Sequence, residues 1–482
     1  MKKIFYFLLI FIITGNCSFD NKTGIWNNEN QKPTTNPIDI GKLGKNQEYI
    51  KKCKRSIFSI KRNNKCKNEE FVNKNLINVF PKDKIYTEEK QISLNEKLKI
   101  NSPLKNNNWS EQYLSSTNNI ANLYYTNKQE LVYKSSRLSK NSNDISPLFY
   151  NNNLVSYDHK GTIFIYSLEE DRKILEYNFY NKEFKKYKKK LYLTIDNDVI
   201  YVADNLGFVY SIKIKTNKVI WAKNFGVPFR SNIKILNNNL YLANEENQLY
   251  AINIINGNTN WTFSTQVSIL RSSFKNNILI DEKNNNVILL NTSAELYSIN
   301  YLNKNINWII NFNSSSQVNE NEIFNSFPLI LNNNNKLITS SGSSLAGYDV
   351  ITKKKMWEKK LIIDTKATIT ENNVFVYTAE NFLICLDLIN GNIIWAKDLF
   401  NQIKLVNKKY TSKKIGNIVS QTIADNEILL FSDKGYLITF DFKNGKLNSV
   451  KKIVNSGIKG RPIIVEGYIY LFDKKNKLLQ FN

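Results

Sequence analysis

The chain contains one histidine and four cysteines, the side chains most often used for acid–base, nucleophilic and metal chemistry. His159 lies in the sequence YDHKG, which is typical of a turn between strands, so a solvated loop residue is favoured over a general base or a metal ligand. Cys385 falls at a position of an internal repeat where every copy has a small or slim side chain, which predicts a buried core residue. The sequence therefore presents no recognisable catalytic apparatus.

Cys17 is a candidate for a different chemistry, lipid modification. Residues 1–3 form a basic start, residues 4–13 are an unbroken apolar run, and Cys17 follows shortly after. The run is typical of a secretory signal and is too short for a comfortable membrane span. A Cys at this place, without an A-x-A site before it, resembles the lipobox of bacterial lipoproteins. We expect residues 1–16 to be a signal peptide and Cys17 to be acylated; simple secretion and an uncleaved anchor are the alternatives.

Residues 17–108 are rich in Asn and Lys, contain Pro33 and Pro37 and show little periodicity. This composition predicts a tether that is mostly disordered. Cys53 and Cys66 lie within it, and after export they could form a disulfide or stay as two unpaired thiols.

The formal net charge of +25 raises the question of nucleic-acid binding. The lysines are scattered among asparagines, in the tether and in most inter-strand turns, and they form no basic stripe with interleaved aromatic residues. We therefore predict no nucleic-acid partner. The charge predicts only a general attraction to anionic lipid surfaces and acidic partners.

The organisation of the rest of the chain follows from a short cassette that occurs seven times, for example QLYAINIINGNTNW (248–261) and FLICLDLINGNIIW (382–395). Five copies end in Trp, and in the two weaker copies Tyr177 and Ser449 take its place. The aromatic residues at this end position are Tyr177, Trp221, Trp261, Trp308, Trp357 and Trp395.

Within each cassette the residue types predict a β-hairpin. In five copies Asn or Asp stands eight residues before the end position, and Gly or Asn, which tolerate positive φ, often stands four before it. Apolar and polar residues alternate on both sides, as in half-buried strands. Because the copies recur about every 40 to 50 residues, they predict propeller blades of four strands each. One Trp per blade predicts core packing or docking between blades instead of a binding array.

The two ends of the chain indicate a closed ring. The last residues, NKLLQFN (476–482), match the cassette only as far as its Asn, and the missing strand is supplied by KQELVYKSSRL (128–138), with Tyr133 as its aromatic residue. If these strands pair, an eighth blade is assembled from both ends and the ring has no free edge. The expected fold is all-β, an eight-bladed β-propeller of four-stranded antiparallel blades over residues 109–482.

Cassettes of the form L-Y-A-x-[DN]-x-x-x-G-x-x-x-W resemble the PQQ-like repeats of quinoprotein-type propellers, and the resemblance covers residues 133–482. One branch of this superfamily comprises quinone-dependent dehydrogenases, which need a catalytic Asp, a calcium site of carboxylate and amide oxygens and, typically, adjacent cysteines. No two cysteines are adjacent here, and no calcium-binding cluster is recognisable. The other branch is the BamB family, lipoproteins of the outer-membrane β-barrel assembly machinery, and its features match the signal, the tether and the repeats.

The BamB resemblance implies a scaffold that is not an enzyme and has no cofactor. It would be a monomer within a complex, held by acylated Cys17 in the inner leaflet of the outer membrane of a Gram-negative bacterium, on the periplasmic face. Its partners would be the POTRA domains of the central barrel subunit and unfolded outer-membrane protein clients. The segment matching the family's docking loop is SSSQVNENEIFNS (314–326), and its candidate contact residues are Val318, Glu320, Glu322, Ile323 and Phe324. A plain solvated loop is the alternative for this segment.

Two other functions remain open from the sequence. One is an exported enzyme that uses the central channel, either a quinoprotein-like oxidoreductase or a hydrolase with carboxylates in the funnel. The other is a propeller that binds a polysaccharide or another envelope protein. Two facing carboxylates with raised pKa values in the channel would favour an enzyme, whereas an apolar and charged loop patch on one rim would favour docking.

Overall fold

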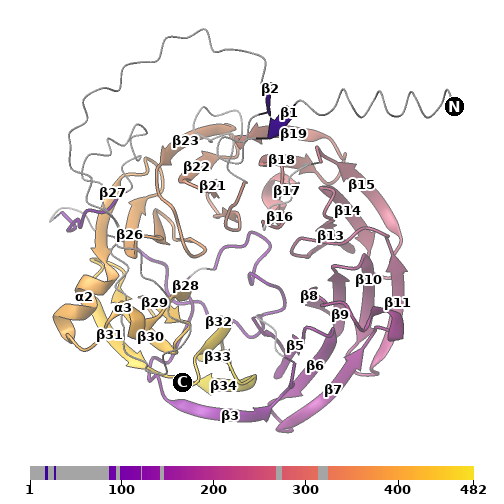
Figure 1. The fold of residues 1–482 in the computed structure, drawn as a ribbon, viewed down its shortest axis with the longest axis horizontal. Coiled ribbons are helices and arrows are strands. Elements are labelled where there is room, and N and C mark those ends of the chain that lie inside the picture. The colour runs from indigo at the N-terminus through magenta and orange to yellow at the C-terminus, as the bar shows by residue number, and fades with distance from the viewer. Residues whose placement is uncertain are drawn as a thin grey trace. The chain divides into compact units, whose positions relative to one another are not determined.

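The structure, a computed structural model, describes residues 17–19, 26–28, 86–93, 98–120, 122–141, 146–267, 274–312 and 324–482. The chain divides into two compact units, residues 1–77 and 78–482. In the first unit, β1 (Cys17–Phe19) pairs antiparallel with β2 (Trp26–Asn28). In the second, eight four-stranded antiparallel sheets form a ring, which confirms the predicted eight-bladed propeller (Figure 1). Within these ranges no helix has the length and apolar character needed to cross a membrane.

The first four blades each consist of four consecutive strands, with the first strand of each blade nearest the axis (Figure 1). Their strands are β4 (Leu148–Tyr150), β5 (Asn153–Tyr157), β6 (Thr162–Ser167) and β7 (Arg172–Asn178) in blade 1; β8 (Leu191–Asp196), β9 (Val199–Asp204), β10 (Phe208–Lys213) and β11 (Lys218–Asn224) in blade 2; β12 (Lys234–Leu236), β13 (Asn239–Ala243), β14 (Gln248–Asn253) and β15 (Thr259–Ser264) in blade 3; and β16 (Asn277–Asp281), β17 (Asn286–Leu290), β18 (Glu295–Asn300) and β19 (Ile306–Asn311) in blade 4. Two single-turn 3₁₀ helices, η1 (Lys182–Phe184) and η2 (Glu282–Asn284), lie in connections.

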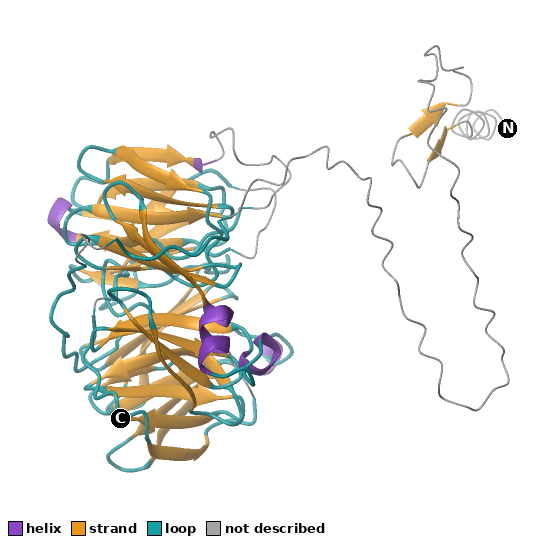
Figure 2. Ribbon diagram, turned by 90° about the vertical axis from the view of Figure 1, so that its left-hand side faces the viewer, coloured by secondary structure: helices purple, strands orange, loops and turns teal. Residues whose placement is uncertain are grey.

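The remaining blades follow the same plan, except that the last one takes a strand from the N-terminal side. Their strands are β20 (Ile330–Leu331), β21 (Lys336–Ser341), β22 (Ser344–Asp349) and β23 (Lys354–Lys359) in blade 5; β24 (Thr368–Ile369), β25 (Asn373–Tyr377), β26 (Phe382–Asp387) and β27 (Ile393–Asp398) in blade 6; β28 (Ile418–Ala424), β29 (Glu427–Ser432), β30 (Tyr436–Asp441) and β31 (Leu447–Lys452) in blade 7; and β32 (Ile458–Val465), β33 (Tyr468–Asp473), β34 (Lys477–Phe481) and β3 (Leu131–Arg137) in blade 8. Helices α2 (Leu399–Val406) and α3 (Ser412–Ile415) connect blade 6 to blade 7 and lie at one side of the ring in the edge-on view (Figure 2).

The ring closes as the sequence predicts, because β3 pairs antiparallel with β34. Tyr133 lies opposite Gln480, and the register shifts between Leu131 and Tyr133. A bulge lies in the same place beside Trp395 of blade 6. The backbone N–H of Asn482 donates to the carbonyl of Glu130 at 3.1 Å and completes the hairpin. The N-terminal strand therefore supplies the eighth copy of the Trp-bearing strand, and the sheet edge that would otherwise be exposed is paired.

The cassette forms the predicted hairpin between the third and fourth strands of a blade. In blade 6, Oδ1 of Asp387 accepts hydrogen bonds from the backbone N–H groups of Ile389 and Asn390, and Gly391, with a φ of +69°, ends the turn. The position four residues before the aromatic position has positive φ in every blade, although only three blades have Gly there: Gln129, Asp171, Asn217, Gly257, Lys304, Lys353, Gly391 and Gly445. Hydrophobic clusters fill the space between neighbouring blades, so the core lies around the ring.

One repeat assignment is wrong. The sequence places Tyr177 at the Trp position of blade 1, but the register puts Leu175 there, opposite Ile165 and directly before the bulge. Tyr177 lies two residues further along β7, opposite Ile163, and is partly buried. The turn that precedes it, EEDRK (169–173), is polar throughout and contains no Gly, so the sequence offers no marker for the register.

A segment without regular secondary structure, residues 109–120 and 122–126, crosses one mouth of the channel; we call it the plug (Figure 1). It touches all eight blades in order around the ring. Its contacts are Trp109 with Phe149, Ser110 with Ile195, Glu111 with Lys234, Ser116 with Ile280, Thr117 with Leu331, Asn119 with Ile369, Leu123 with Ile423, and Thr126 with Gly467. Trp109, Leu123 and Tyr125 are at most 1% exposed. The sequence includes the plug in the propeller range but gives no sign of its course.

The plug makes the two faces of the ring different. Most of its partners lie at the ends of first strands, next to the turns into second strands, so it covers the face that carries these turns; we call this the closed face. The opposite, open face carries the turns between second and third strands and the connections from one blade to the next. Those connections include α2, α3 and the segment between β19 and β20.

The last part of the predicted tether lies along the propeller. Lys90 pairs with Ala396 on the outer strand of blade 6, and Tyr86 makes an edge-on ring contact with Phe382. Further on, Leu104 donates its N–H to the carbonyl of Asn122 at 2.8 Å. Residues 86–93 and 98–108 thus differ from the tether prediction by being packed on the ring, whereas Cys53 and Cys66 lie outside the described residues.

Candidate functional site

The main candidate site is a cavity of about 1200 Å³ within the ring, open toward the open face. Its walls come from the starts of first strands, including Leu191 and Tyr192, and from the second-to-third-strand turns that carry His159 and Asn205. Gln112 of the plug also contributes to the lining. The plug therefore separates this cavity from the closed face.

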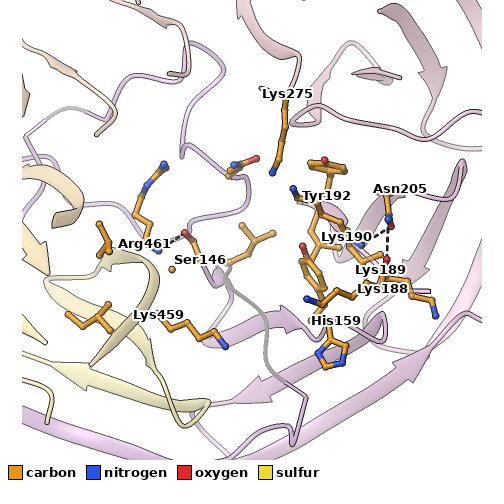
Figure 3. Close-up of a pocket in the computed structure, with 18 of the residues that line it drawn as sticks. Ser146, His159, Lys188, Lys189, Lys190, Tyr192, Asn205, Lys275, Lys459 and Arg461 are labelled. Atoms are coloured by element: carbon orange, nitrogen blue, oxygen red, sulfur yellow. Dashed lines mark hydrogen bonds between the residues drawn. The ribbon is translucent and has the colours of Figure 1, made fainter. Parts of the chain in front are cut away.

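Basic side chains dominate the lining (Figure 3). The seven basic residues are Lys188, Lys189, Lys190, Lys275, Lys459, Arg461 and Lys474. The carboxylate among the described lining residues is Asp433, which forms an ion pair with Lys474 at 3.1 Å. Among the described lining residues, the other six basic side chains therefore have little negative charge to offset their mutual repulsion.

Hydrogen bonds to its backbone hold the segment Lys188–Lys190 in place. The N–H of Lys190 donates to Oδ1 of Asn205 at 2.8 Å, and Nδ2 of Asn205 donates to the carbonyl of Lys188 at 3.1 Å (Figure 3). The N–H of Lys189 donates to the carbonyl of His159 at 2.8 Å. The connection into blade 2 is thus fixed to two turns of the open face, with its lysines beside the cavity.

Lys275 reaches into the cavity from the connection into blade 4, and its Nζ lies 5.2 Å from the ring centre of Tyr192 (Figure 3). Burial lowers the pKa of Lys275 to about 7, and the positive charges of Lys190 and Arg230 act in the same direction. The ammonium of Lys275 is therefore less stable than that of an ordinary surface lysine. A negative charge placed beside it would reverse this effect.

A second group of cations surrounds the plug below the cavity. The guanidinium of Arg461 and the Nζ of Lys366 lie 5.0 and 5.9 Å from the ring centre of Tyr113, within the range of cation–π attraction. Burial lowers the pKa of Lys366 well below its usual range, and Arg461 and Lys234 add to this. Lys234 is paired with Glu111 of the plug at 2.8 Å. Basic side chains thus continue from the mouth of the cavity to the plug.

A protein-family model described as "Outer membrane protein assembly factor BamB" matches residues 182–397. Among solved structures, BamB from Moraxella catarrhalis superposes with a TM-score of 0.58 at 13% identity, covering 73% of this chain and 99% of that one. The chain carries a propeller of PQQ-like repeats that is similar to BamB.

Two enzymes share the fold. Quinohemoprotein alcohol dehydrogenase from Comamonas testosteroni gives a TM-score of 0.58 at 9% identity, over 78% of this chain and 80% of that one. A europium-containing methanol dehydrogenase gives 0.56 at 11%, over 76% and 89%. A search of curated protein sequences gives no significant match. At these identities the structural likeness establishes the fold and leaves the function to the site.

The cavity does not match the donor set expected for a calcium-dependent quinone site. In the described ranges, no three His, Cys, Asp or Glu side chains are grouped in a way that could hold a metal ion. Asp433 is already paired with Lys474, and the remaining charged lining groups, apart from His159, are cations. The residues of this cavity therefore favour binding of a negatively charged molecule over coordination of a cation.

Asp204 and Asp158 are two further carboxylates near the cavity, since both act on Lys189. The hydrogen bonds of Asp204 are structural. Oδ1 of Asp204 accepts hydrogen bonds from the N–H groups of Leu206 and Phe208, and Oδ2 accepts one from the hydroxyl of Tyr180. Burial raises the pKa of Asp204, while these hydrogen bonds oppose the rise. Both oxygens of Asp204 are thus engaged in structural hydrogen bonds.

The residues singled out from the sequence lie in different places. His159 is in the turn between β5 and β6, as expected, and it also lines the mouth of the cavity. Cys385 is buried opposite Trp395, as predicted. Cys17 belongs to β1 in the first unit.

Of the candidate partner residues, Val318, Glu320, Glu322 and Ile323 lie outside the described residues. Phe324 is partly buried; its ring stacks on Phe312 and meets Phe274 edge-on. This packing gives Phe324 a structural role at one end of the loop. The lysines of the cavity were missed because they come from two connections, the start of β32 and one turn, which are far apart in the sequence. Only the run of three at 188–190 hinted at them.

Proposed function

We propose that this protein is a non-enzymatic scaffold of the outer-membrane β-barrel assembly machinery. In this role the acylated Cys17 holds it at the periplasmic side of the outer membrane, the propeller docks the POTRA domains of the central barrel subunit, and the complex aids insertion of outer-membrane proteins. The observation that carries the proposal is the BamB family match over residues 182–397, which covers blades 2 to 5 and most of blade 6. The cation-lined cavity supports it, since its described wall lacks the donor set of the dehydrogenases.

The open face offers surface suited to docking. In α2, Leu399 and Ile403 are fully buried, whereas Leu405 and Val406 are 80% and 66% exposed. Leu405 and Tyr410 line a shallow pocket of about 550 Å³. All blade-to-blade connections share this face, so the predicted docking loop, which joins β19 to β20, begins and ends on the same side as α2. An apolar patch bordered by lysines is the kind of rim that favours binding of a protein partner.

A pull-down from detergent-solubilised envelopes with the tagged full-length protein tests this proposal. We expect mass spectrometry to recover the central barrel subunit. One variant replaces Val318, Glu320, Glu322 and Ile323 with Ser together and keeps Phe324, because Phe324 packs on Phe312. A second variant replaces Leu405 and Val406 with Ser. At least one of them should lose the partner.

A matched control carries Ile255→Ser and Ile389→Ser. These side chains are 68% and 54% exposed and lie in turns of the closed face. The control should retain the partner. Recovery of no assembly component by the wild-type protein, or equal loss in the control, would contradict the proposal.

The anchor has its own test. Cells fed an alkyne-labelled fatty acid should incorporate the label into the wild-type protein and not into a Cys17→Ser variant. The variant should also move from the membrane fraction to the soluble periplasmic fraction, because a buried acyl chain contributes about 0.8 kcal/mol per CH₂ group to membrane binding. Labelling of the variant, or equal membrane association of both proteins, would show that Cys17 is not the anchor.

A further inference from the structure

The lining of the cavity holds seven basic side chains and, among the described residues, one carboxylate, that of Asp433. Six of its seven basic side chains are lysines, and Asp433 pairs with Lys474 alone among them. Lys275 lies close enough to Lys190 and Arg230 for both to disfavour its charged form. Lys275 is partly buried, and moving a charge out of water beside other cations is unfavourable. A cluster of this kind is best stabilised by an anion that enters from outside.

Arg461 provides an independent indication. Its Nη1 is buried and, in the described part of the chain, has no hydrogen-bond acceptor. The side chain is held at this place by the contact of its guanidinium with the Tyr113 ring, and its backbone N–H donates to Oγ of Ser146 at 3.1 Å. A buried donor without an acceptor destabilises the folded state unless a ligand or water supplies one.

We propose that the axial cavity binds a compact anion that carries several phosphate groups. Phosphate is favoured over an isolated carboxylate because the lining supplies many ammonium groups, which act as point charges toward clustered oxygen atoms, and one guanidinium with a free donor. The volume of about 1200 Å³ is that of a small-molecule site and not of a groove for a folded partner. Tyr157, Tyr192 and Leu191 add apolar wall against which an organic part of the ligand can pack.

The plug determines how the ligand enters. Since Trp109, Leu123 and Tyr125 fill the closed face, the anion must come from the open face. Lys188 and Lys474 lie in loops of that face, at the start of the path, and Lys275, Lys459 and Arg461 line the wall beyond them. The phosphate groups could belong to a free oligophosphate or to the phosphorylated head group of a lipid, because both present the same oxygen clusters.

Titration calorimetry with sodium tripolyphosphate and the full-length protein tests the proposal at about 0.15 M salt, where the Debye length of about 8 Å screens diffuse attraction. We expect saturable binding with one ligand per chain. The triple variant Lys190→Gln, Lys275→Gln, Lys459→Gln should weaken binding by about a hundredfold or more, because each charge-assisted contact contributes about tenfold.

The control is Lys213→Gln, Lys218→Gln, Lys223→Gln, which removes the same charge from exposed positions of β10 and β11. It should bind within about twofold of the wild type, and thermal melting should show that both triple variants are folded. Equal weakening in the two triples would overturn the proposal, because binding would then follow net charge alone. Absence of saturable binding to the folded wild-type protein would overturn it as well.

Vesicles distinguish the two sources of phosphate. Flotation with vesicles that contain a phosphatidylinositol bisphosphate is compared for the two triple variants, with phosphatidylcholine vesicles as the blank. If the Lys190→Gln, Lys275→Gln, Lys459→Gln variant loses flotation and the control variant keeps it, the site is assigned to a lipid head group. Equal flotation of both, together with selective loss of tripolyphosphate binding, assigns it to a free oligophosphate.

Discussion

The five blade junctions that contain a cassette Trp are of two kinds, although the same cassette builds both. At the junctions of blades 2 and 3, 5 and 6, and 6 and 7, the Trp of one blade is buried against the next, with Trp221, Trp357 and Trp395 at most 8% exposed. At the junctions of blades 3 and 4 and of 4 and 5, Trp261 and Trp308 are only partly buried. We call the first set tight junctions and the second set loose junctions.

The tight junctions share one arrangement. The indole N–H donates to a carbonyl in the next blade, from Trp221 to Ile254 at 2.8 Å, from Trp357 to Leu388 at 2.8 Å and from Trp395 to Phe442 at 3.2 Å. The ring also lies on the turn Gly of that blade. A Cβ at Gly391 would come within 2.5 Å of the Trp357 ring, and Gly257 and Gly445 stand in the same relation to the other two rings.

The loose junctions differ at that one residue. Lys304 and Lys353 take the place of Gly, with φ values of +67° and +61°. A Cβ at this position occupies the space that the indole fills in the tight junctions, so the ring of the preceding blade cannot approach the turn as closely. The Trp alone therefore does not determine how closely two blades pack; the turn residue against which it rests does.

The largest effect is expected from removing a tight-junction ring. Trp395→Ala should lower the free energy of unfolding by about 3 to 5 kcal/mol, since Trp395 is fully buried and its N–H bond is lost with the ring. Trp308→Ala is the matched variant at a loose junction and should have a clearly smaller effect, because water already reaches part of that ring. Urea denaturation followed by circular dichroism measures both. Equal losses would mean that the two kinds of junction do not differ in energy.

The next effect is expected from filling the space above a turn. Gly391→Ala should destabilise the protein by about 1 to 3 kcal/mol, because the new methyl group meets the Trp357 ring and Ala at positive φ is strained. A double-mutant cycle separates these causes. If the clash dominates, Gly391→Ala should become much less harmful in a Trp357→Ala background, whereas an unchanged effect would point to backbone strain alone.

The sequence predicted the parts of the molecule that local residue types determine. The Asx residue, the positive-φ position and the Trp follow one another within a single hairpin, and the paired halves at Tyr133 and Gln480 could be recognised as a divided cassette. Tyr177 was misplaced because its turn contains no Gly to mark the register.

The plug and the cavity could not be predicted for a different reason. Ser110, Ser116 and Leu123 bind strands that lie up to about 300 residues away, through backbone groups that carry no residue signature. Lys190, Lys275 and Lys459 line the same cavity only because the ring closes. In the sequence they are three lysines among many. Contacts that depend on the closed ring leave no local pattern.

The smallest effect has the opposite sign and tests the comparison most directly. Lys304→Gly should convert the loose junction of blades 3 and 4 toward a tight one. Lys at a φ of +67° is strained by about 1 to 2 kcal/mol, and Gly loses about 0.5 to 1 kcal/mol more backbone entropy on folding, so a net gain of about 0.5 to 1 kcal/mol is expected. The indole of Trp261 should then approach the turn, and its exposure to water should fall.

Trp261 fluorescence is isolated by comparison with a Trp261→Phe variant, and its quenching by acrylamide should decrease together with a rise in the urea midpoint. Lys353→Gly should repeat this for Trp308, whereas Lys443→Gly, in a turn where Gly445 already holds the positive-φ position, should not. A rise in stability without reduced quenching would attribute the gain to relieved backbone strain alone, and the turn residue would then not control how deeply the Trp is buried.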